Sequence, residues 1–303
     1  MNLFSTILCI FCLSIAQNSV GQTPKRTHKT HKRFVFTPKP VSHRDIFNHK
    51  MRQQMPTSTA KGVLYFGKTF LGYAYPKPRV DSTQQATNGV QLQPIEAEVL
   101  VVNLKTFDCV TFIESMVALT ETRRALLPNF DIFKRNLTNI RYRSGLVDYS
   151  ARLHYFSDWL FENEKRGILK DITQDIGGEV FPKTVNYMSL KRDTLYGNMA
   201  DPTTFTAIKT IENAITKRPK FYIPKEDIPD VESKIRNGDI IAVTNRLEGM
   251  DIAHTGFAIW KNGRVYMLHA SSQFRKVIVT DVPLADYLMK NKGQTGIMVG
   301  RLN

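Results

Sequence analysis

The chain is short of cysteine and of acidic residues. Its 303 residues include 3 cysteines, and 27 Asp and Glu stand against 42 Lys and Arg, which gives a net charge of +15 at pH 7. Long apolar runs are also lacking, because the run at residues 3–15 is too short to span a bilayer as a stable helix. With 42% hydrophobic residues, the sequence describes a globular protein of one large or two small domains with a sizeable core.

The start of the chain lacks charge altogether, since residues 1–21 contain no Asp, Glu, Lys or Arg. We interpret residues 1–21 as a secretory signal peptide, with small residues placed for cleavage after Ala16 or Gly21. An uncleaved membrane anchor is the alternative. Cys9 and Cys12 lie in this segment and follow no lipoprotein pattern, so no lipid anchor is predicted. We therefore expect an exported, periplasmic protein.

Residues 22–42 lack acidic residues and are rich in Lys, Arg, Pro and Thr. Their composition cannot build a core, so we expect a basic flexible linker over residues 22–45. Such a linker could contact an anionic envelope surface electrostatically. Nucleic acid is not expected as a partner, because no basic motif interleaved with aromatic residues follows.

Residues 103–119 are predicted to contain a helix that begins at Cys109, which would be the single cysteine of the mature chain. Its apolar residues recur at helical spacing and cover more than one face, as in a buried helix. Thr106 and Asp108 are both N-cap candidates. At a helix N-terminus, free N–H groups and the macrodipole favour thiolate, so we expect a lowered pKa and an activated nucleophile. A small buried core cysteine is the alternative.

Helical patterns precede strand patterns along the chain. Helices are predicted at residues 60–71 and 150–165 and after the Asp201-Pro202 pair, and residues 98–103 are expected to be extended. Short β-type runs follow at residues 239–243, 255–260, 265–270, 276–280 and 296–300. Helices first and an antiparallel sheet afterwards predict an α+β fold.

Two of these strands are joined by Asn262-Gly263, a signal for a two-residue type I′ hairpin. The turn sets a register that pairs Lys261 with Arg264, Ala258 with Met267, and Gly256 with His269.

The same register places two histidines on one face of the hairpin. His254 lies diagonal to His269, roughly 7–8 Å away, and Gly256 leaves the space between them open. Together with Cys109, this pair fits the nucleophile, base and orienting group of thiol acyl transfer. Cysteine and two histidines could also bind zinc, although zinc would quench the thiol, so no metal or other cofactor is predicted.

Several motifs, in order and spacing, resemble those of the NlpC-type cell-wall cysteine peptidases, which belong to the papain-like superfamily. They are residues 71–75, 108–109, 238–240, 254–257 and 268–271. Within that superfamily the chain is similar to the N-acetylmuramoyl-L-alanine amidase-like branch, whose hallmarks match residues 107–114, 140–145 and 150–159. The resemblance spans residues 60–300. It departs from the wider superfamily at Val110-Thr111, where Ser-Gly is usual.

The resemblance implies a fold and roles for individual residues. The fold is a papain-like NlpC-type core, in which the N-terminal helix bearing the cysteine packs on a C-terminal antiparallel sheet. Cys109 would be the nucleophile, His254 the general base and later acid, and His269 the group that orients His254. Tyr75 would line the cleft, and Asp108 matches an aspartate that recognises a peptide amine in related endopeptidases.

The stretch between Cys109 and Asp239 is some 130 residues, longer than is typical of the wider superfamily. We expect a single catalytic domain over residues 46–303 with a helical insertion at about 125–230 that reshapes the cleft. Arg141, Arg152 and His154 lie in it and are the remaining candidate substrate-binding residues. In the alternative reading, the arginines of this region (Arg143 included) are surface charges paired with Glu162, Glu164 or Asp158.

The expected substrate is peptidoglycan or a muropeptide, cut at the amide between N-acetylmuramic acid and L-alanine. Two alternatives stay open. One is an endopeptidase of the same fold that cuts γ-D-glutamyl–diamino acid bonds, and the other is a non-catalytic peptidoglycan-binding module.

Overall fold

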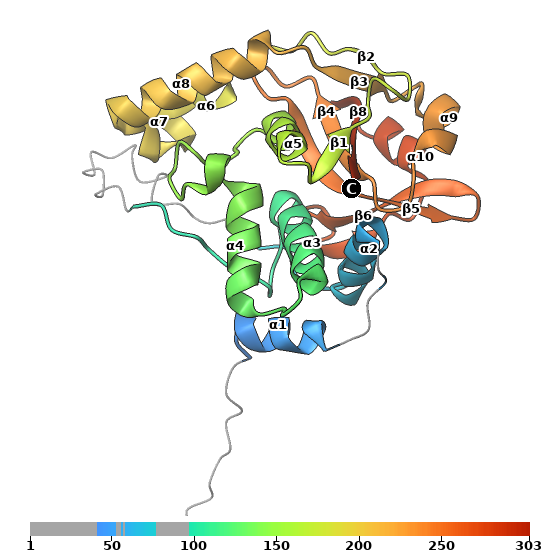
Figure 1. Cartoon of the computed structure of the whole chain (residues 1–303). Coiled ribbons are helices and arrows are strands. Elements are labelled where there is room, and N and C mark those ends of the chain that lie inside the picture. The colour runs from blue at the N-terminus through green and yellow to red at the C-terminus, as the bar shows by residue number, and fades with distance from the viewer. Residues whose placement is uncertain (1–40, 53–55, 57, 77–96) are drawn as a thin grey trace, which may run out of the picture. The chain divides into compact units, whose positions relative to one another are not determined.

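The strands of the C-terminal half form the sheet on which the rest of the domain is packed (Figure 1). A computed structural model describes residues 41–52, 56, 58–76 and 97–303. These belong to one unit, Val41–Asn303. The predicted signal peptide and the linker up to residue 40 lie outside the described residues. None of the described helices is long and apolar enough to cross a membrane.

The helices gather mainly in the first two thirds of the chain. They are α1 (His43–Met51), α2 (Thr59–Thr69), α3 (Cys109–Arg124), α4 (Phe130–Arg141), α5 (Phe156–Lys165), α6 (Tyr187–Leu190), α7 (Arg192–Leu195), α8 (Pro202–Lys217), α9 (Ile228–Val231) and α10 (Leu284–Met289), with the 3-10 turns η2 (Arg143–Gly145), η3 (Gly197–Ala200) and η4 (Glu232–Lys234).

The strands are β1 (Leu169–Asp171), β2 (Glu179–Val180), β3 (Phe221–Pro224), β4 (Ile240–Asn245), β5 (Ile252–Lys261), β6 (Arg264–Ser271), β7 (Lys276–Val279) and β8 (Gln294–Leu302). Within the described residues they form one eight-stranded sheet in the order β2-β3-β8-β4-β5-β6-β7, and β1 also pairs with β8. All of these strand pairs are antiparallel. Helices and an antiparallel sheet make the fold α+β, as predicted.

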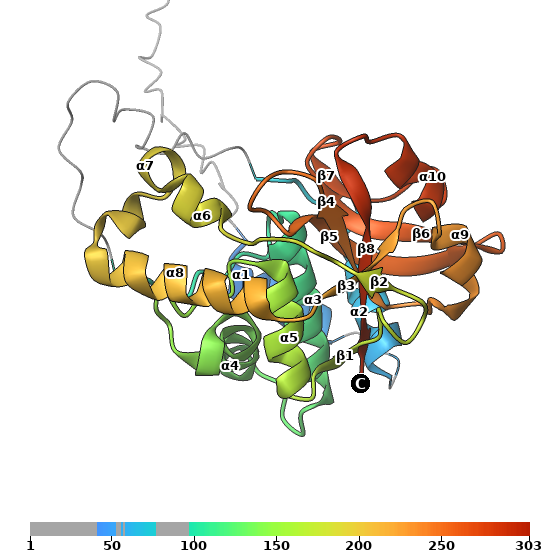
Figure 2. The same ribbon diagram turned by 90° about the horizontal axis from the view of Figure 1, so that it is seen from above.

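Both faces of the sheet are covered, which explains why β4 is buried along its whole length. Ile240 and Ala242 belong to the core shared with α2 and α3, whereas Ile241 and Val243 belong to a second core under α9 and α10. Figure 2 shows α2 and α10 on opposite sides of the strands. A strand that packs on both faces reads as a continuous apolar run, as residues 240–243 do.

The hairpin register is confirmed where the ladder runs. Lys261 pairs with Arg264 and Ala258 with Met267, and the ladder continues to Phe257 and Leu268. Asn262 and Gly263 have φ values of 52° and 73°, and a type I′ turn requires both to be positive.

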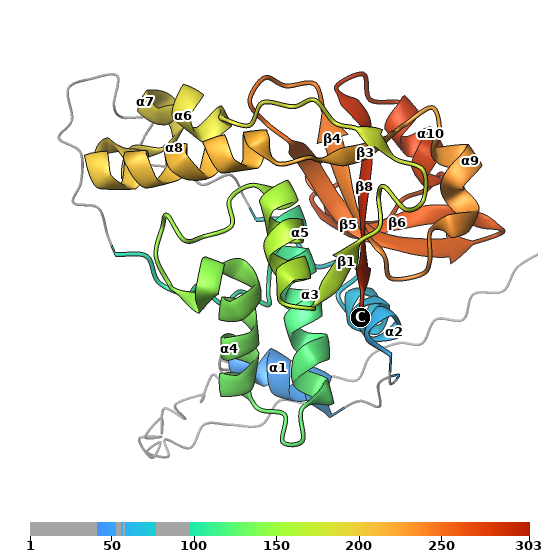
Figure 3. The same ribbon diagram turned by 45° about the horizontal axis from the view of Figure 1, so that its top comes forward.

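The insertion at about 125–230 is only partly helical, which corrects the prediction. Its helices α6 to α8 lie together to one side of the sheet and bury a small core of their own (Figure 3). It also supplies β1, β2 and β3, and Leu169 and Ile223 pair with Leu302 and Ile297 of β8. Strands of two to four residues are too short to show a periodic pattern in the sequence. They form because they pair with a strand far along the chain.

Two predicted boundaries also need correction. The basic linker does not reach residue 45, because α1 begins at His43, where Ser42 and Asp45 form a capping box. The helix predicted at 150–165 begins only at Phe156, and before it Arg152 pairs with Tyr142 in an isolated bridge.

Candidate active site

Helix α3 presents Cys109 as its first residue. Asp108 is the N-cap: its carboxylate accepts a hydrogen bond from the Thr111 N–H at 2.7 Å, and its own N–H donates to the Thr111 hydroxyl. This capping box fixes where the helix begins, as the sequence predicted. Cys109 is a free cysteine and partly exposed.

The two predicted histidines are in contact. His254 of β5 and His269 of β6 approach to 2.5 Å between Nε2 and Nδ1, and their rings meet edge to face with centroids 4.8 Å apart. His269 is fully buried. A Cβ on Gly256 would lie 2.4 Å from the Met267 Cγ and 3.0 Å from the His269 Cβ, so a glycine suits this close approach to β6. The predicted placement of the pair is confirmed, whereas the catalytic roles stay predictions.

Thr255 joins the cysteine helix to the histidine strand. Its buried hydroxyl donates a hydrogen bond to the Cys109 carbonyl at 2.8 Å. Because Thr255 directly follows His254, this bond brings the start of α3 to the part of β5 that carries the histidine. Sequence reasoning did not single out Thr255, although it lies inside the motif at residues 254–257.

The thiol of Cys109 is not a resting thiolate, which corrects the prediction of a lowered pKa. Burial and the adjacent Asp108 carboxylate raise its pKa to about 11, and they outweigh hydrogen bonds from Thr255 and from the Val110 N–H, which act in the opposite direction. The helix N-terminus therefore stabilises the thiolate less than its surroundings destabilise it.

Both imidazoles of the pair are neutral at neutral pH. Burial lowers the pKa of His254 to about 4, and burial together with His254 lowers the pKa of His269 to about 3. The site thus combines a neutral thiol, at the helix start that is bonded to Thr255, with two neutral imidazoles, one of which belongs to the neighbouring residue His254. Such a site can transfer the thiol proton to an imidazole when the sulfur attacks a carbonyl.

Tyr75 lies close enough to Cys109 to interact with it electrostatically, whereas its place in a substrate cleft stays a prediction. Burial, Cys109 and Asp108 raise the pKa of Tyr75 to about 12, and Arg275 acts in the opposite direction. The Arg275 guanidinium lies over the Tyr75 ring, 5.0 Å from its centroid, and the Arg275 carbonyl accepts the Tyr75 N–H at 2.9 Å. Arg275 is a neighbour that no sequence signal indicated.

Arg141 is buried and already bonded within the protein. Its Nε donates to Glu114 of α3 at 2.7 Å, and one of its amino groups donates to the Val101 carbonyl at 2.7 Å. Burial alone would lower the pKa of Arg141. Glu114, with smaller contributions from Tyr142 and Asp108, raises it by more, so the pKa lies above its usual value. Arg141 therefore ties α4 to the cysteine helix in this structure, and its binding of substrate stays a prediction.

Arg152 and His154 lie together, and neither has a direct contact with Cys109 or the histidine pair. Arg152 pairs with Glu98 at 3.4 Å, and the His154 Nε2 lies 2.7 Å from the Tyr149 carbonyl. Burial lowers the pKa of His154 to about 4. Their binding of substrate also stays a prediction.

The alternative prediction, that the arginines pair with Asp158 or Glu162, is confirmed for Arg143. Arg143 pairs with both carboxylates.

No group of three or more His, Cys, Asp or Glu side chains in the described part of the chain is arranged to hold a metal ion. The zinc alternative therefore has no ligand set among these residues.

We expect Cys109 to titrate as a buried thiol. Its alkylation by iodoacetamide should accelerate as the pH rises toward about 11, because thiolate, the reactive form, is scarce below that pKa. The rate is measured by intact-mass spectrometry across a pH series. A rate that is already constant from pH 6 to pH 8 would show a resting thiolate and contradict this assignment.

Replacing Asp108 by Asn should lower the Cys109 pKa. Asn caps helices about as well as Asp, so the capping box can persist while the negative charge beside the thiol is lost. We expect faster alkylation of Asp108→Asn than of the wild type at pH 8, with unchanged helix content by circular dichroism. Equal or slower alkylation would show that Asp108 does not oppose thiolate formation.

Comparison with solved structures finds related folds. A crystal structure of an N-acetylmuramoyl-L-alanine amidase from Bacteroides uniformis is 33% identical, covers 81% of this chain and 99% of its own, and superposes with a TM-score of 0.71. A Bacteroides fragilis structure described as a xylanase candidate is 32% identical, covers 78% and 99%, and has a TM-score of 0.68.

A Legionella pneumophila structure at 23% identity covers 86% of this chain and 93% of its own with a TM-score of 0.57, and it shows likeness of fold alone. No curated protein matches the chain. Residues 66–297 match the model of one protein family, which is described as AmiA-like, N-acetylmuramoyl-L-alanine amidase-like. The chain therefore belongs to the N-acetylmuramoyl-L-alanine amidase-like family.

Proposed function

We propose that this chain is an exported cysteine amidase that hydrolyses the bond between N-acetylmuramic acid and L-alanine in peptidoglycan or muropeptides. One observation carries the proposal: Cys109 begins a helix that is hydrogen-bonded to Thr255, directly beside the bonded His254 and His269 pair. The family's description indicates which bond is cut, the amide between N-acetylmuramic acid and L-alanine. Cys109 supplies a nucleophile for this reaction, and His254 supplies a base.

The first half of the reaction acylates the enzyme. The Cys109 sulfur attacks the lactyl carbonyl carbon while the thiol proton passes to His254. The oxyanion that forms faces the N-terminus of α3, where no described residue accepts the Cys109 N–H, so this N–H is free to donate to it. His254 then gives the proton to the departing L-alanine nitrogen, the C–N bond breaks, and a muramoyl thioester remains.

The second half regenerates the thiol. His254 takes a proton from water, the hydroxide adds to the thioester carbonyl, and the C–S bond breaks with return of that proton to the sulfur. The N-acetylmuramic acid portion leaves with its lactyl carboxyl group restored. Each step uses the same base, whose lowered pKa keeps it unprotonated between transfers at neutral pH.

His269 suits an orienting role. If Nε2 of His254 donates to Nδ1 of His269, then Nδ1 of His254 is left unprotonated and can act as the base. The hydrogen bond also holds the His254 ring at one angle. His269 acts through His254 and is therefore a positioning residue.

A glycosidase reading is less well supported. Most glycosidases need two carboxyl groups flanking the scissile bond. Among the described residues, Asp108 is the one carboxylate whose charge acts on Cys109, and it is bonded to the Thr111 N–H.

Removing the thiol should abolish activity. We expect Cys109→Ala and Cys109→Ser to lower release of stem peptide from a defined muropeptide by at least about a thousandfold, because nucleophile and base act as a unit. Release is followed by mass spectrometry of the products, with thermal unfolding as the check that each variant is folded. Undiminished release by either variant would contradict the mechanism.

The same products separate the alternatives. An intact stem peptide with free N-acetylmuramic acid supports the amidase, whereas a cut after γ-D-glutamate would identify an endopeptidase. Binding without turnover by the wild type would identify a binding module. Loss of activity with a chelator but not with iodoacetamide would favour a metal site.

Export predicts a shortened mature chain. In a bacterial host that processes the signal, we expect the protein in the periplasmic fraction, with an N-terminus at Gln17 or Gln22 because cleavage follows Ala16 or Gly21. N-terminal sequencing of the fractionated protein measures this. A full-length chain recovered from the cytoplasm would contradict export, and one recovered from the membrane would indicate an uncleaved anchor.

A further inference from the structure

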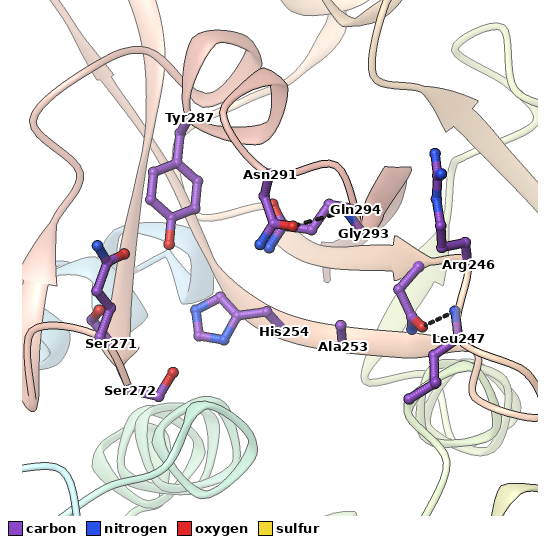
Figure 4. Close-up of a pocket in the computed structure, with 12 residues that line it drawn as sticks. Arg246, Leu247, Ala253, His254, Ser271, Ser272, Tyr287, Asn291, Gly293 and Gln294 are labelled. Carbon is purple, nitrogen blue, oxygen red and sulfur yellow. Dashed lines mark hydrogen bonds between the residues drawn. The ribbon is translucent and has the colours of Figure 1, made fainter.

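A cavity of about 530 Å³ lies directly beside His254. Figure 4 shows it bordered by the loop after β4, the start of β5, the loop after β6, α10 and the start of β8. Its volume lies in the range of sites for small ligands. None of the residues that line it belongs to α3.

The lining combines uncharged hydrogen-bonding side chains with the apolar Leu247 and Ala253, and it holds one cation. Asparagine, glutamine, serine and tyrosine side chains surround the space, and Arg246 is the one charged residue of the lining, with His254 neutral. No described carboxylate pairs with Arg246, whose side chain is exposed. The cavity is therefore suited to an uncharged polar backbone that carries a negative group at one end.

A buried side chain of the lining, Gln294, indicates that the cavity binds a ligand. Its side chain is 9% exposed, and its Oε1 is buried with no hydrogen-bond partner among the described residues. A buried acceptor without a partner is costly, so an N–H group of a ligand would satisfy it. Figure 4 shows Gln294 beside Asn291 and Gly293, so its free acceptor belongs to the same cavity as His254 and Arg246.

The position of Arg246 is set by its backbone. The Arg246 N–H donates to the Gly293 carbonyl at 3.0 Å, and the Leu247 N–H donates to the Asn245 side chain at 2.8 Å. The loop is thus held at its base on β8, and the exposed guanidinium can turn toward a ligand in the cavity.

The chemistry of the reaction says which part of a substrate meets this cavity. His254 must lie within hydrogen-bond reach of the departing nitrogen in order to protonate it. The leaving peptide therefore begins at His254, whereas the acyl portion lies toward Cys109 and the N-terminus of α3. A cavity that starts at His254 and excludes α3 is on the side of the leaving peptide.

We propose that this cavity holds the departing stem peptide and that Arg246 binds the free α-carboxylate of its second residue, D-glutamate. The inference rests on the proposed amidase function. D-Glutamate in a stem peptide is linked through its γ-carboxyl, so its α-carboxylate is the first negative charge beyond the scissile bond. The free acceptor of Gln294 then takes an N–H of this peptide. Arg246 is then a specificity-determining residue.

Two substrates that differ in this carboxylate test the proposal. They are N-acetylmuramoyl-L-alanyl-D-glutamate and its isoglutamine form, in which the α-carboxyl is an amide. We expect wild-type kcat/KM to be about tenfold higher for the glutamate form, as a charge-assisted hydrogen bond would give. Arg246→Gln should bring the two values together, chiefly by lowering that of the glutamate form. Arg135→Gln, an exposed arginine of α4 outside the cavity, should leave the ratio unchanged.

The outcomes are separable. Equal wild-type kcat/KM for the two forms, or a ratio that Arg246→Gln leaves unchanged, would overturn the role of Arg246 while the amidase function stands. No release of peptide from either form by the wild type would overturn the proposed function and the inference with it.

Discussion

The hydrogen bond from the Thr255 hydroxyl to the Cys109 carbonyl is the contact on which the candidate site depends. It joins residues 146 positions apart in sequence, one at the start of α3 and the other beside His254. Because the Thr255 side chain is buried, loss of the bond would leave an unpaired polar group in the core. The geometry of thiol and imidazole is therefore coupled to the packing of helix on sheet.

That packing is supported from both sides. Phe112 of α3 meets Phe257 of β5 on one face, with ring centroids 6.0 Å apart, and α10 covers the other face, where Tyr287 meets the His269 ring. Strands buried on both faces are held in one register, since a slip by one residue would exchange the two cores. The histidines thus stand on a rigid part of the protein, as a site that needs defined angles requires.

Local rules explain which features could be predicted from sequence. The Asn262-Gly263 turn fixed the register that brings His254 and His269 together, and the Asp108 cap fixed the start of α3. Features that depend on distant neighbours could not be read in this way. Burial and Asp108 raise the pKa of Cys109 by more than the hydrogen-bond donors lower it. Arg141 pairs with Glu114, which was not among the carboxylates expected as partners of the arginines. The three strands of the insertion depend on β8. β1 and β3 pair with β8, and β2 pairs with β3.

The central claim is that the Cys109 sulfur carries the muramoyl group during turnover. Acid quenching of the wild-type protein during reaction with a defined muropeptide, followed by proteolysis and mass spectrometry, would measure this directly. The account predicts an N-acetylmuramoyl thioester on the fragment that contains Cys109. An adduct on another residue, or continued turnover by protein whose Cys109 is fully alkylated, would contradict it.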